Sequence, residues 1–264
     1  QGHTFLHEAG GVSVLGGVVI HTVPNQANGT IALQDLEAAL RNPEDAHEPI
    51  SKLVILENTQ NACGGVPISL EYTRSAADFA RKHKLLLHLD GARIFNASVA
   101  LGKSASELAA PADSVTFCLS KGLCAPVGSV LCGNADFIHK AHRLRKILGG
   151  GMRQAGIIAA AGIVALESMV DRLAEDHANA RRLAGGIALI PGLATDPARV
   201  QTNILYLDLT DRRFSDEDFL RRLAKKGLRL SHTAPARFRM LTHYGIEAAH
   251  IDKALAALRS VMEG

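Results

Sequence analysis

Two residues that could do chemistry, Asp90 and Lys121, each come at the end of an apolar run. Asp90 ends LLLHLD (85–90) and Lys121 follows VTFCLS (115–120). Ligands of open α/β sheets bind beyond the carboxyl ends of the strands, so both groups can face one crevice. A lysine amine forms a Schiff base with the aldehyde of pyridoxal phosphate, and a carboxylate pairs with its protonated ring nitrogen. The two residues together therefore favour a pyridoxal phosphate site.

Each feature alone also has an ordinary structural interpretation. DGAR (90–93) is a common Asp-Gly turn, and Lys121 between VTFCL and VGSVLC could be a solvated charge at the tip of a hairpin of buried strands. The 12 histidines show no HxxxH or HxH spacing beside carboxylates, which disfavours a metal site. The glycine-rich segments lack the strand and helix context of a nucleotide-binding loop.

The elements that must position Asp90 and Lys121 alternate between strands and helices, the pattern of a mostly parallel α/β sheet. We expect strands in residues 18–24, 52–58, 85–90, 112–120 and 127–133, and helices in residues 32–41, 70–83 and 135–148. A long alanine-rich helical region is expected from about residue 155 to 184. Shorter strands at 203–209, 228–231 and 237–243 then alternate with helices at 217–227 and from Glu247. This predicts a large cofactor-binding domain in residues 1–155, followed by a connector helix and a small α+β domain in residues 156–264.

Composition excludes several classes of protein. The chain has 264 residues, 47% of them hydrophobic and 21% charged, and a formal net charge of +3, which indicates a folded globular protein without a nucleic-acid-binding pattern. The longest apolar runs are shorter than the roughly 20 residues that a membrane helix needs. Four cysteines without paired metal-type spacing are expected to be buried, reduced thiols, so we expect a cytoplasmic protein.

Four motifs together resemble one family. LENTQNACGG (56–65), HLDGARIFNA (88–97), FCLSKGLCAPVGSVLCG (117–133) and RKILGGGMRQAGIIAAAGI (145–163) are similar in order and spacing to the pyridoxal phosphate-dependent low-specificity L-threonine aldolases. These belong to the β-eliminating lyase group of fold type I enzymes. HTFLHEAGG (3–11) and RFRMLTHY (237–244) also match, so the resemblance covers essentially the whole chain. The family has a further N-terminal segment, with the glycine-rich backbone that holds the cofactor phosphate, and we expect that this sequence lacks it.

The resemblance implies roles for individual residues. Lys121 would be the Schiff-base lysine, and Asp90 the partner of the ring nitrogen. Arg93 would bind the substrate carboxylate through its two-pronged guanidinium. His3 would stack on the cofactor ring near the substrate hydroxyl, and His47 would line the substrate side chain.

Further matches lie later in the chain. Arg239 matches a second carboxylate-binding arginine, with Arg237 as the neighbour expected to face solvent. Arg153 would reach the phosphate or substrate of a neighbouring subunit, whereas Lys146 is expected to be a solvated lysine at a helix end. The family histidine after ENT is replaced by Gln60, which cannot carry a proton near neutral pH.

The implied reaction is retro-aldol cleavage of L-threonine or L-allo-threonine to glycine and acetaldehyde, a step of threonine catabolism and glycine biosynthesis. The base that takes the hydroxyl proton would be His3 or a water molecule near the phosphate. β-Elimination or cleavage of phenylserine-type substrates on the same scaffold is an alternative, and an inactive truncated product is another. The apolar helical region after GGGMRQ (149–154) indicates a homodimer or homotetramer.

Overall fold

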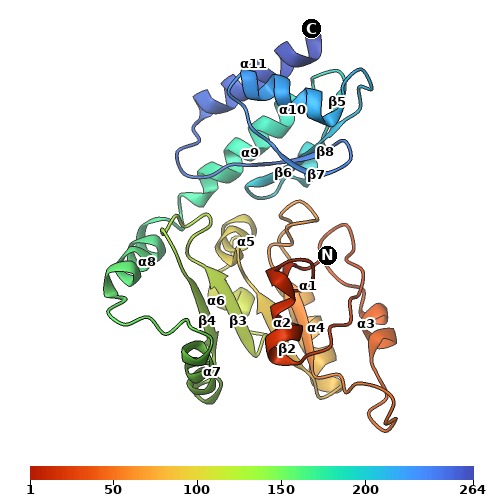
Figure 1. Cartoon of the computed structure of the whole chain (residues 1–264), viewed down its shortest axis with the longest axis vertical. Coiled ribbons are helices and arrows are strands. Elements are labelled where there is room, and N and C mark those ends of the chain that lie inside the picture. The colour runs from red at the N-terminus through yellow and green to blue at the C-terminus, as the bar shows by residue number, and fades with distance from the viewer. The chain divides into compact units, whose positions relative to one another are not determined.

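The computed structural model describes residues 1–264, which form two compact units (Figure 1). The first unit comprises Gln1–Cys63 and Pro67–Val170, and the second comprises Gly64–Val66 and Asp171–Gly264. Helix α8 (Gly156–Ser168), which the sequence assigned to the connector, groups with the first unit.

The first unit is built on a four-stranded sheet in the order β1-β2-β3-β4. Strands β1 (Leu53–Glu57), β2 (Leu86–Asp90) and β3 (Ser114–Cys118) are parallel, and β4 (Ser129–Gly133) runs antiparallel to β3. The expected mostly parallel sheet is therefore present. The carboxyl ends of its three parallel strands lie at the same end of the sheet, and Asp90 is the last residue of β2 there.

One face of this sheet carries the core of the first unit. The inward residues Val54, Leu56, Leu87 and Leu89 are buried against α3 (Leu33–Ala39), α4 (Leu70–Lys82), α5 (Ile94–Leu101) and α6 (Ala105–Ala109). Successive side chains of a strand point to opposite faces, so Glu57, His88 and Asp90 share the other face. The remaining helical segments are α1 (His3–Leu6), η1 (Glu8–Gly10), α2 (Gly11–Gly16) and α7 (Ala135–Ile147).

Helix α4 shows how local sequence sets these elements. The Ser69 side chain accepts the N–H of Tyr72 at 3.2 Å and caps the first turn, and Arg81 and Lys82 occupy the last turn, where the helix dipole favours cations. The face with Leu70, Ala76, Ala77 and Phe79 is buried, which fixes the helix against the sheet.

Three expectations for the first unit are wrong. Residues 18–24 form no strand, and Val19 is 75% exposed, because the apolar run finds no neighbouring strand to pair with. Strand β3 is half-buried rather than fully buried although it lies between β2 and β4, and β4, which is the last strand of the sheet, is half-buried or exposed. The four cysteines are free thiols, but Cys124 and Cys132 are exposed and the other two half-buried.

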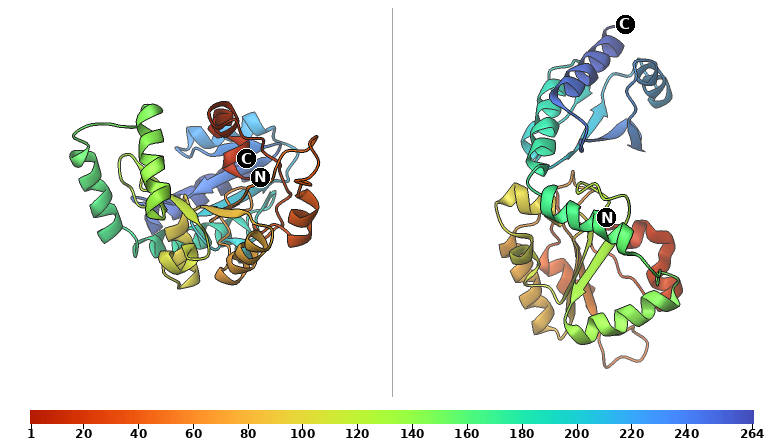
Figure 2. Two further views of the ribbon diagram at one scale, coloured as in Figure 1. Left: turned by 90° about the horizontal axis from the view of Figure 1, so that it is seen from below. Right: turned by 90° about the vertical axis from the view of Figure 1, so that its left-hand side faces the viewer.

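The second unit holds an antiparallel sheet in the order β5-β6-β8-β7. Its strands are β5 (Leu193–Ala194), β6 (Ile204–Leu209), β7 (Ser231–Ala234) and β8 (Arg237–Leu241), and its helical segments are α9 (Leu173–Ile187), η2 (Pro197–Arg199), α10 (Asp216–Lys225) and α11 (Ala248–Glu263). Helices α9 and α11 lie side by side, as Figure 2 shows from two further directions. Phe219 and Phe238 lie in its core at a ring-centroid distance of 5.2 Å. The expected strand at 228–231 begins only at Ser231.

The expected continuous helical region from 155 to 184 is interrupted. It forms α8 and α9, with a break between Ser168 and Leu173. None of the helices is both long and apolar enough to cross a membrane.

Candidate active site

The last residues of β1 and β2, Glu57 and Asp90, are register partners, and Asp90 is also paired with Thr116 of β3. Backbone hydrogen bonds extend this arrangement past the strands. The N–H of Asn58 donates to the carbonyl of Asp90 at 2.8 Å, and the N–H of Gly91 donates to the carbonyl of Thr116 at 2.7 Å. The carboxyl ends of the strands are therefore tied together where the candidate residues begin.

Gly91 allows the chain to turn directly after Asp90. A Cβ atom at this position would lie 2.8 Å from the carbonyl oxygen of Thr116, closer than van der Waals contact allows. The turn leads into α5, whose first residue, Ile94, donates its N–H to the carbonyl of Gly91 at 2.8 Å. Arg93 is the N-cap of this helix and is half-buried, so the turn keeps it close in sequence and space to Asp90.

Asp90 lies in an electrostatic environment that favours its neutral form. Burial and the nearby Glu57 carboxylate raise the pKa of Asp90 above its ordinary value, while the hydrogen bond from the N–H of Ala92 and the charges of Lys121 and His3 work in the opposite direction. The N–H of Ala92 donates to Oδ1 of Asp90 at 3.1 Å. Burial and the Glu57 carboxylate thus outweigh the hydrogen bond and the positive charges that act on Asp90.

This donor set fits pyridoxal phosphate. A protonated ring nitrogen beside Asp90 would supply the positive charge that its carboxyl group lacks, because an opposite charge favours the ionised form. Lys121 lies in the loop after β3, three residues beyond Cys118, and its charge acts on Asp90. Asp90 would hold the ring nitrogen and Lys121 the aldehyde carbon.

Contacts with Glu57 hold His3 at the carboxyl end of the sheet. The backbone N–H of His3 donates to Oε2 of Glu57 at 2.8 Å, and its ring Nδ1 lies 3.0 Å from Oε1. Burial works to raise the pKa of Glu57, but the hydrogen bonds from His3 and from the N–H of Asn61 hold it below its ordinary value. Glu57 is thus an ionised carboxylate that anchors His3 beside Asp90.

The structure does not bring His47 to this group of residues within one chain. His47 lies in the loop that leads into β1, at the amino end of the sheet, whereas Glu57 and Asp90 lie at the carboxyl end. Its side chain is 95% exposed, and its ring Nδ1 lies 2.9 Å from Oδ1 of Asp45. A substrate-lining role for His47 stays a prediction.

Residues of the segment between α7 and α8 are also exposed. Arg153 faces solvent in the chain described here, and Nζ of Lys146, in the last turn of α7, donates to the carbonyl of Gly151 at 3.4 Å. Gln60, which replaces the family histidine, is fully buried and accepts the N–H of Cys63 at 3.1 Å. Gln60 therefore has a structural role in the loop after β1.

Arg239 belongs to the second unit, on β8. Its register partner on β6 is Tyr206, and its side chain is half-buried. Arg237, two residues earlier, is exposed, as expected, with Nη1 3.5 Å from Asp208 and its guanidinium over the ring of Tyr206. Of the two arginines, Arg239 is the more buried.

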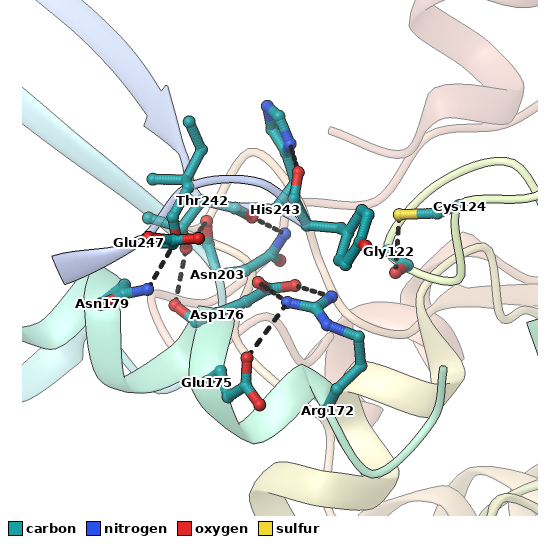
Figure 3. A network of polar contacts seen from close by, with 12 residues as sticks. Gly122, Cys124, Arg172, Glu175, Asp176, Asn179, Asn203, Thr242, His243 and Glu247 are labelled. Atoms are coloured by element: carbon teal, nitrogen blue, oxygen red, sulfur yellow. Dashed lines mark hydrogen bonds and ion pairs between the residues drawn. The ribbon is translucent and has the colours of Figure 1, made fainter. Parts of the chain in front are cut away.

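A buried polar network holds the end of β8 in the second unit (Figure 3). Arg172 donates to both oxygens of the fully buried Asp176, at 3.1 and 2.6 Å. The hydroxyl of Thr242, just after β8, donates to the carbonyl of Asp176 at 2.6 Å, and Nδ2 of Asn203 donates to the carbonyl of Thr242 at 2.8 Å. These bonds tie β8, which carries Arg239, to α9 and to the residue before β6.

The sequence interpretation missed Glu57 and His88. Nδ1 of His88 lies 2.8 Å from the hydroxyl of Ser114, and Nε2 lies 3.4 Å from that of Thr116, so His88 links β2 to β3 two residues before Asp90. The signal for Glu57 was present, since a charged residue ends the apolar run LVIL (53–56) just as Asp90 ends its own run.

Comparisons with known proteins show which family this chain is similar to. The sequence profile of the beta-eliminating lyase family matches residues 1–210. Low-specificity L-threonine aldolase 1 of Arabidopsis thaliana is 41% identical over 262 residues, which are 98% of this chain and 73% of the relative. The low specificity L-threonine aldolase of Escherichia coli (strain K12) is 46% identical over 205 residues, 78% of this chain and 60% of the relative.

Solved structures show the same fold. The threonine aldolase of Leishmania major superposes with a TM-score of 0.82 at 20% identity, over 99% of this chain and 75% of the other. An aspartate aminotransferase from Rhodobacter sphaeroides superposes with a TM-score of 0.64 at 20% identity, over 88% of this chain and 60% of the other.

These findings confirm the fold type I architecture and the resemblance to low-specificity threonine aldolases that the motifs indicated. They also confirm the expected enzyme class, a lyase that depends on pyridoxal phosphate. The chain belongs to the beta-eliminating lyase family.

Proposed function

We propose that this protein cleaves L-threonine or L-allo-threonine to glycine and acetaldehyde. The observation that carries the proposal is the position of Asp90 and Lys121 at the carboxyl ends of β2 and β3, with His3 held beside them by Glu57. The relatives named as threonine aldolases support it, since the match covers nearly the whole chain.

The cofactor and the residues around it have separate roles in this reaction. When bound, pyridoxal phosphate supplies an electron sink for the electron pair of the breaking Cα–Cβ bond. Lys121 holds the cofactor, and the Asp90 carboxylate keeps its ring nitrogen protonated. Arg93 binds the substrate carboxylate, and this orientation selects the bond that breaks. A carboxylate-binding role for Arg239, which the family resemblance implies, stays a prediction.

His3 is the base for the substrate hydroxyl. Its Nδ1 is engaged by Glu57, which leaves Nε2 to accept the hydroxyl proton as acetaldehyde departs. Cα then regains a proton, which completes glycine. An acid–base group of this kind contributes about 10²–10⁴-fold to a rate.

A product assay tests the proposal. The chain loaded with pyridoxal phosphate should convert L-threonine to equal amounts of acetaldehyde and glycine, without release of a 2-oxo acid. Release of a 2-oxo acid with ammonia would assign β-elimination instead, and much faster release of benzaldehyde from phenylserine would assign an aryl substrate. Absence of any product from protein that has bound the cofactor would identify an inactive chain.

We further propose a homodimer or homotetramer in the cytoplasm. Helix α8 supports the assembly, since it is apolar all round and yet Ile157 is 88% exposed in one chain. The four free thiols support a reducing compartment. In such an assembly His47 and Arg153, exposed in one chain, would contribute to a neighbouring site.

A further inference from the structure

The Glu57 side chain makes three hydrogen-bonding contacts, all to residues outside its own strand. Its Oε1 accepts the backbone N–H of Asn61 at 3.1 Å and lies 3.0 Å from Nδ1 of His3, and its Oε2 accepts the backbone N–H of His3 at 2.8 Å. The Glu57 side chain is 8% exposed and that of His3 is 28% exposed. Two of these three contacts go to one residue that lies 54 positions away in the sequence.

The chemistry of these contacts determines where the proton of the neutral His3 ring lies. An ionised carboxylate can only accept hydrogen bonds, so the ring nitrogen that faces it must be the one that carries a proton. The backbone contact at 2.8 Å fixes the position of His3 relative to the same carboxylate. The other ring nitrogen, Nε2, is then left with its lone pair.

We propose that Glu57 is a positioning residue for His3: it holds the ring in the Nδ1–H tautomer and so presents Nε2 as a proton acceptor. The use of Nε2 as a proton acceptor in catalysis rests on the proposed function, whereas the Nδ1–H tautomer of His3 does not depend on it. It also explains why a carboxylate lies beside Asp90, where it disfavours the ionised form of Asp90.

The charged and titratable groups around His3 come from three elements besides Glu57. His7 directly follows α1. Its ring centroid lies 4.9 Å from that of His3, and the two ring planes are tilted by 38°. Asp90 at the end of β2 interacts electrostatically with His3, and Lys121 in the loop after β3 acts on the same carboxyl group. Of these groups, only Glu57 is hydrogen-bonded to the His3 ring.

The test reads the tautomer directly. In the full chain with ¹⁵N-labelled histidine and no cofactor, above about pH 8 where an ordinary imidazole is neutral, the ¹⁵N shifts of His3 should show the proton on Nδ1. A spectrum of His3→Gln assigns the signals. The same proteins, loaded with pyridoxal phosphate, are then assayed for acetaldehyde release from L-threonine.

Glu57→Gln is the informative variant. Its amide has only one oxygen, and when this oxygen takes the place of Oε2 and accepts the backbone N–H of His3, the NH₂ group takes the place of Oε1. The NH₂ group then faces Nδ1 and should shift the ring toward the Nε2–H form. We expect kcat to fall about 10²-fold, the lower end of the range for an acid–base group. Glu57→Asp retains a carboxylate and should keep the Nδ1–H form.

A matched control separates this role from a structural one. Asp113 also accepts a backbone N–H, from Leu87 at 2.8 Å, but at the amino end of β3. Asp113→Asn should leave the His3 signals and kcat unchanged. A wild-type ring with its proton on Nε2 overturns the proposal, and the wild-type spectrum decides this even if the variant does not fold. Loaded wild-type protein that releases no acetaldehyde contradicts the proposed function and leaves the tautomer result standing.

Discussion

Glu57 and Asp90 are register partners on neighbouring parallel strands, so two carboxyl groups lie side by side at the carboxyl end of the sheet. Their environments separate them. Three hydrogen-bonding contacts to His3 and Asn61 keep the pKa of Glu57 low, whereas burial and the Glu57 charge raise that of Asp90. Glu57 is thus an ionised carboxylate that is hydrogen-bonded to His3, whereas Asp90 would be stabilised in its ionised form by a cation beside it.

Removal of Asp90 and alteration of Arg93 should affect different ligands. Asp90→Asn should weaken pyridoxal phosphate binding by about 10- to 100-fold, the equivalent of one charged hydrogen bond, whereas Arg93→Lys should retain the cofactor and weaken glycine binding, because an ammonium cannot reproduce a planar two-bond fork. Sequential titrations with cofactor and glycine measure both effects. Arg81→Lys, on the exposed face of α4, is the control. If Arg93→Lys loses the cofactor while Asp90→Asn keeps it, the two roles are reversed.

Lys121 should be the residue that borohydride labels with the cofactor. Lys121→Ala should abolish turnover without altering the circular dichroism spectrum, because the half-buried side chain lies in a loop outside the core. Peptide mapping after reduction identifies the labelled lysine. Lys146→Ala, at the end of α7, should retain both label and turnover. A label on any other lysine contradicts the assignment.

Asp176 should contribute strongly to the stability of the second unit. Asp176→Ala leaves the Arg172 guanidinium without its buried partner, so the free energy of unfolding should fall by about 3–5 kcal/mol. Asp252 forms an exposed ion pair with Arg182, and Asp252→Ala should cost less than about 1 kcal/mol. Urea unfolding measures both. Equal losses would show that burial of the Arg172–Asp176 pair does not matter.

His177 should make the protein less stable in mild acid. Burial, with a smaller effect of Arg181, lowers the pKa of His177 from 6.5 to about 4, so between these values the unfolded chain binds more protons than the folded one. Stability is therefore complete above pH 6.5 and falls as the pH approaches 4, by at most about 3 kcal/mol. Urea midpoints at several pH values reveal the slope, and His177→Gln should flatten it. A wild-type midpoint that is constant from pH 7 to about pH 4 would contradict the shift.

Helix α8 should lie in a contact between subunits. Ile157→Glu places a charge on an apolar surface and should dissociate the assembly, as measured by light scattering. Glu167→Gln on the same helix changes a polar residue and should leave the molar mass unchanged. A wild-type monomer at assay concentration would contradict the proposed assembly.

The amino-acid sequence by itself determined the elements and most of the candidate residues. Hydrophobic periodicity marked β1, β2 and β3 and the helices α3, α4, α7, α10 and α11, because burial of one face imposes a period that residue types record. Asp90 and Lys121 were visible because charged residues directly after apolar runs mark the ends of strands. The family resemblance then connected these residues to a cofactor and a reaction.

Only the tertiary structure decided which residues meet. The apolar run 18–24 has the composition of a strand but no partner, and strand formation depends on a neighbour that local sequence does not specify. The contact between His3 and Glu57 joins residues 54 positions apart, and the pairing of Glu57 with Asp90 depends on strand order and register. Those relationships arise when the sheet assembles. The opposite pKa shifts of Glu57 and Asp90 could therefore be derived only from the folded chain.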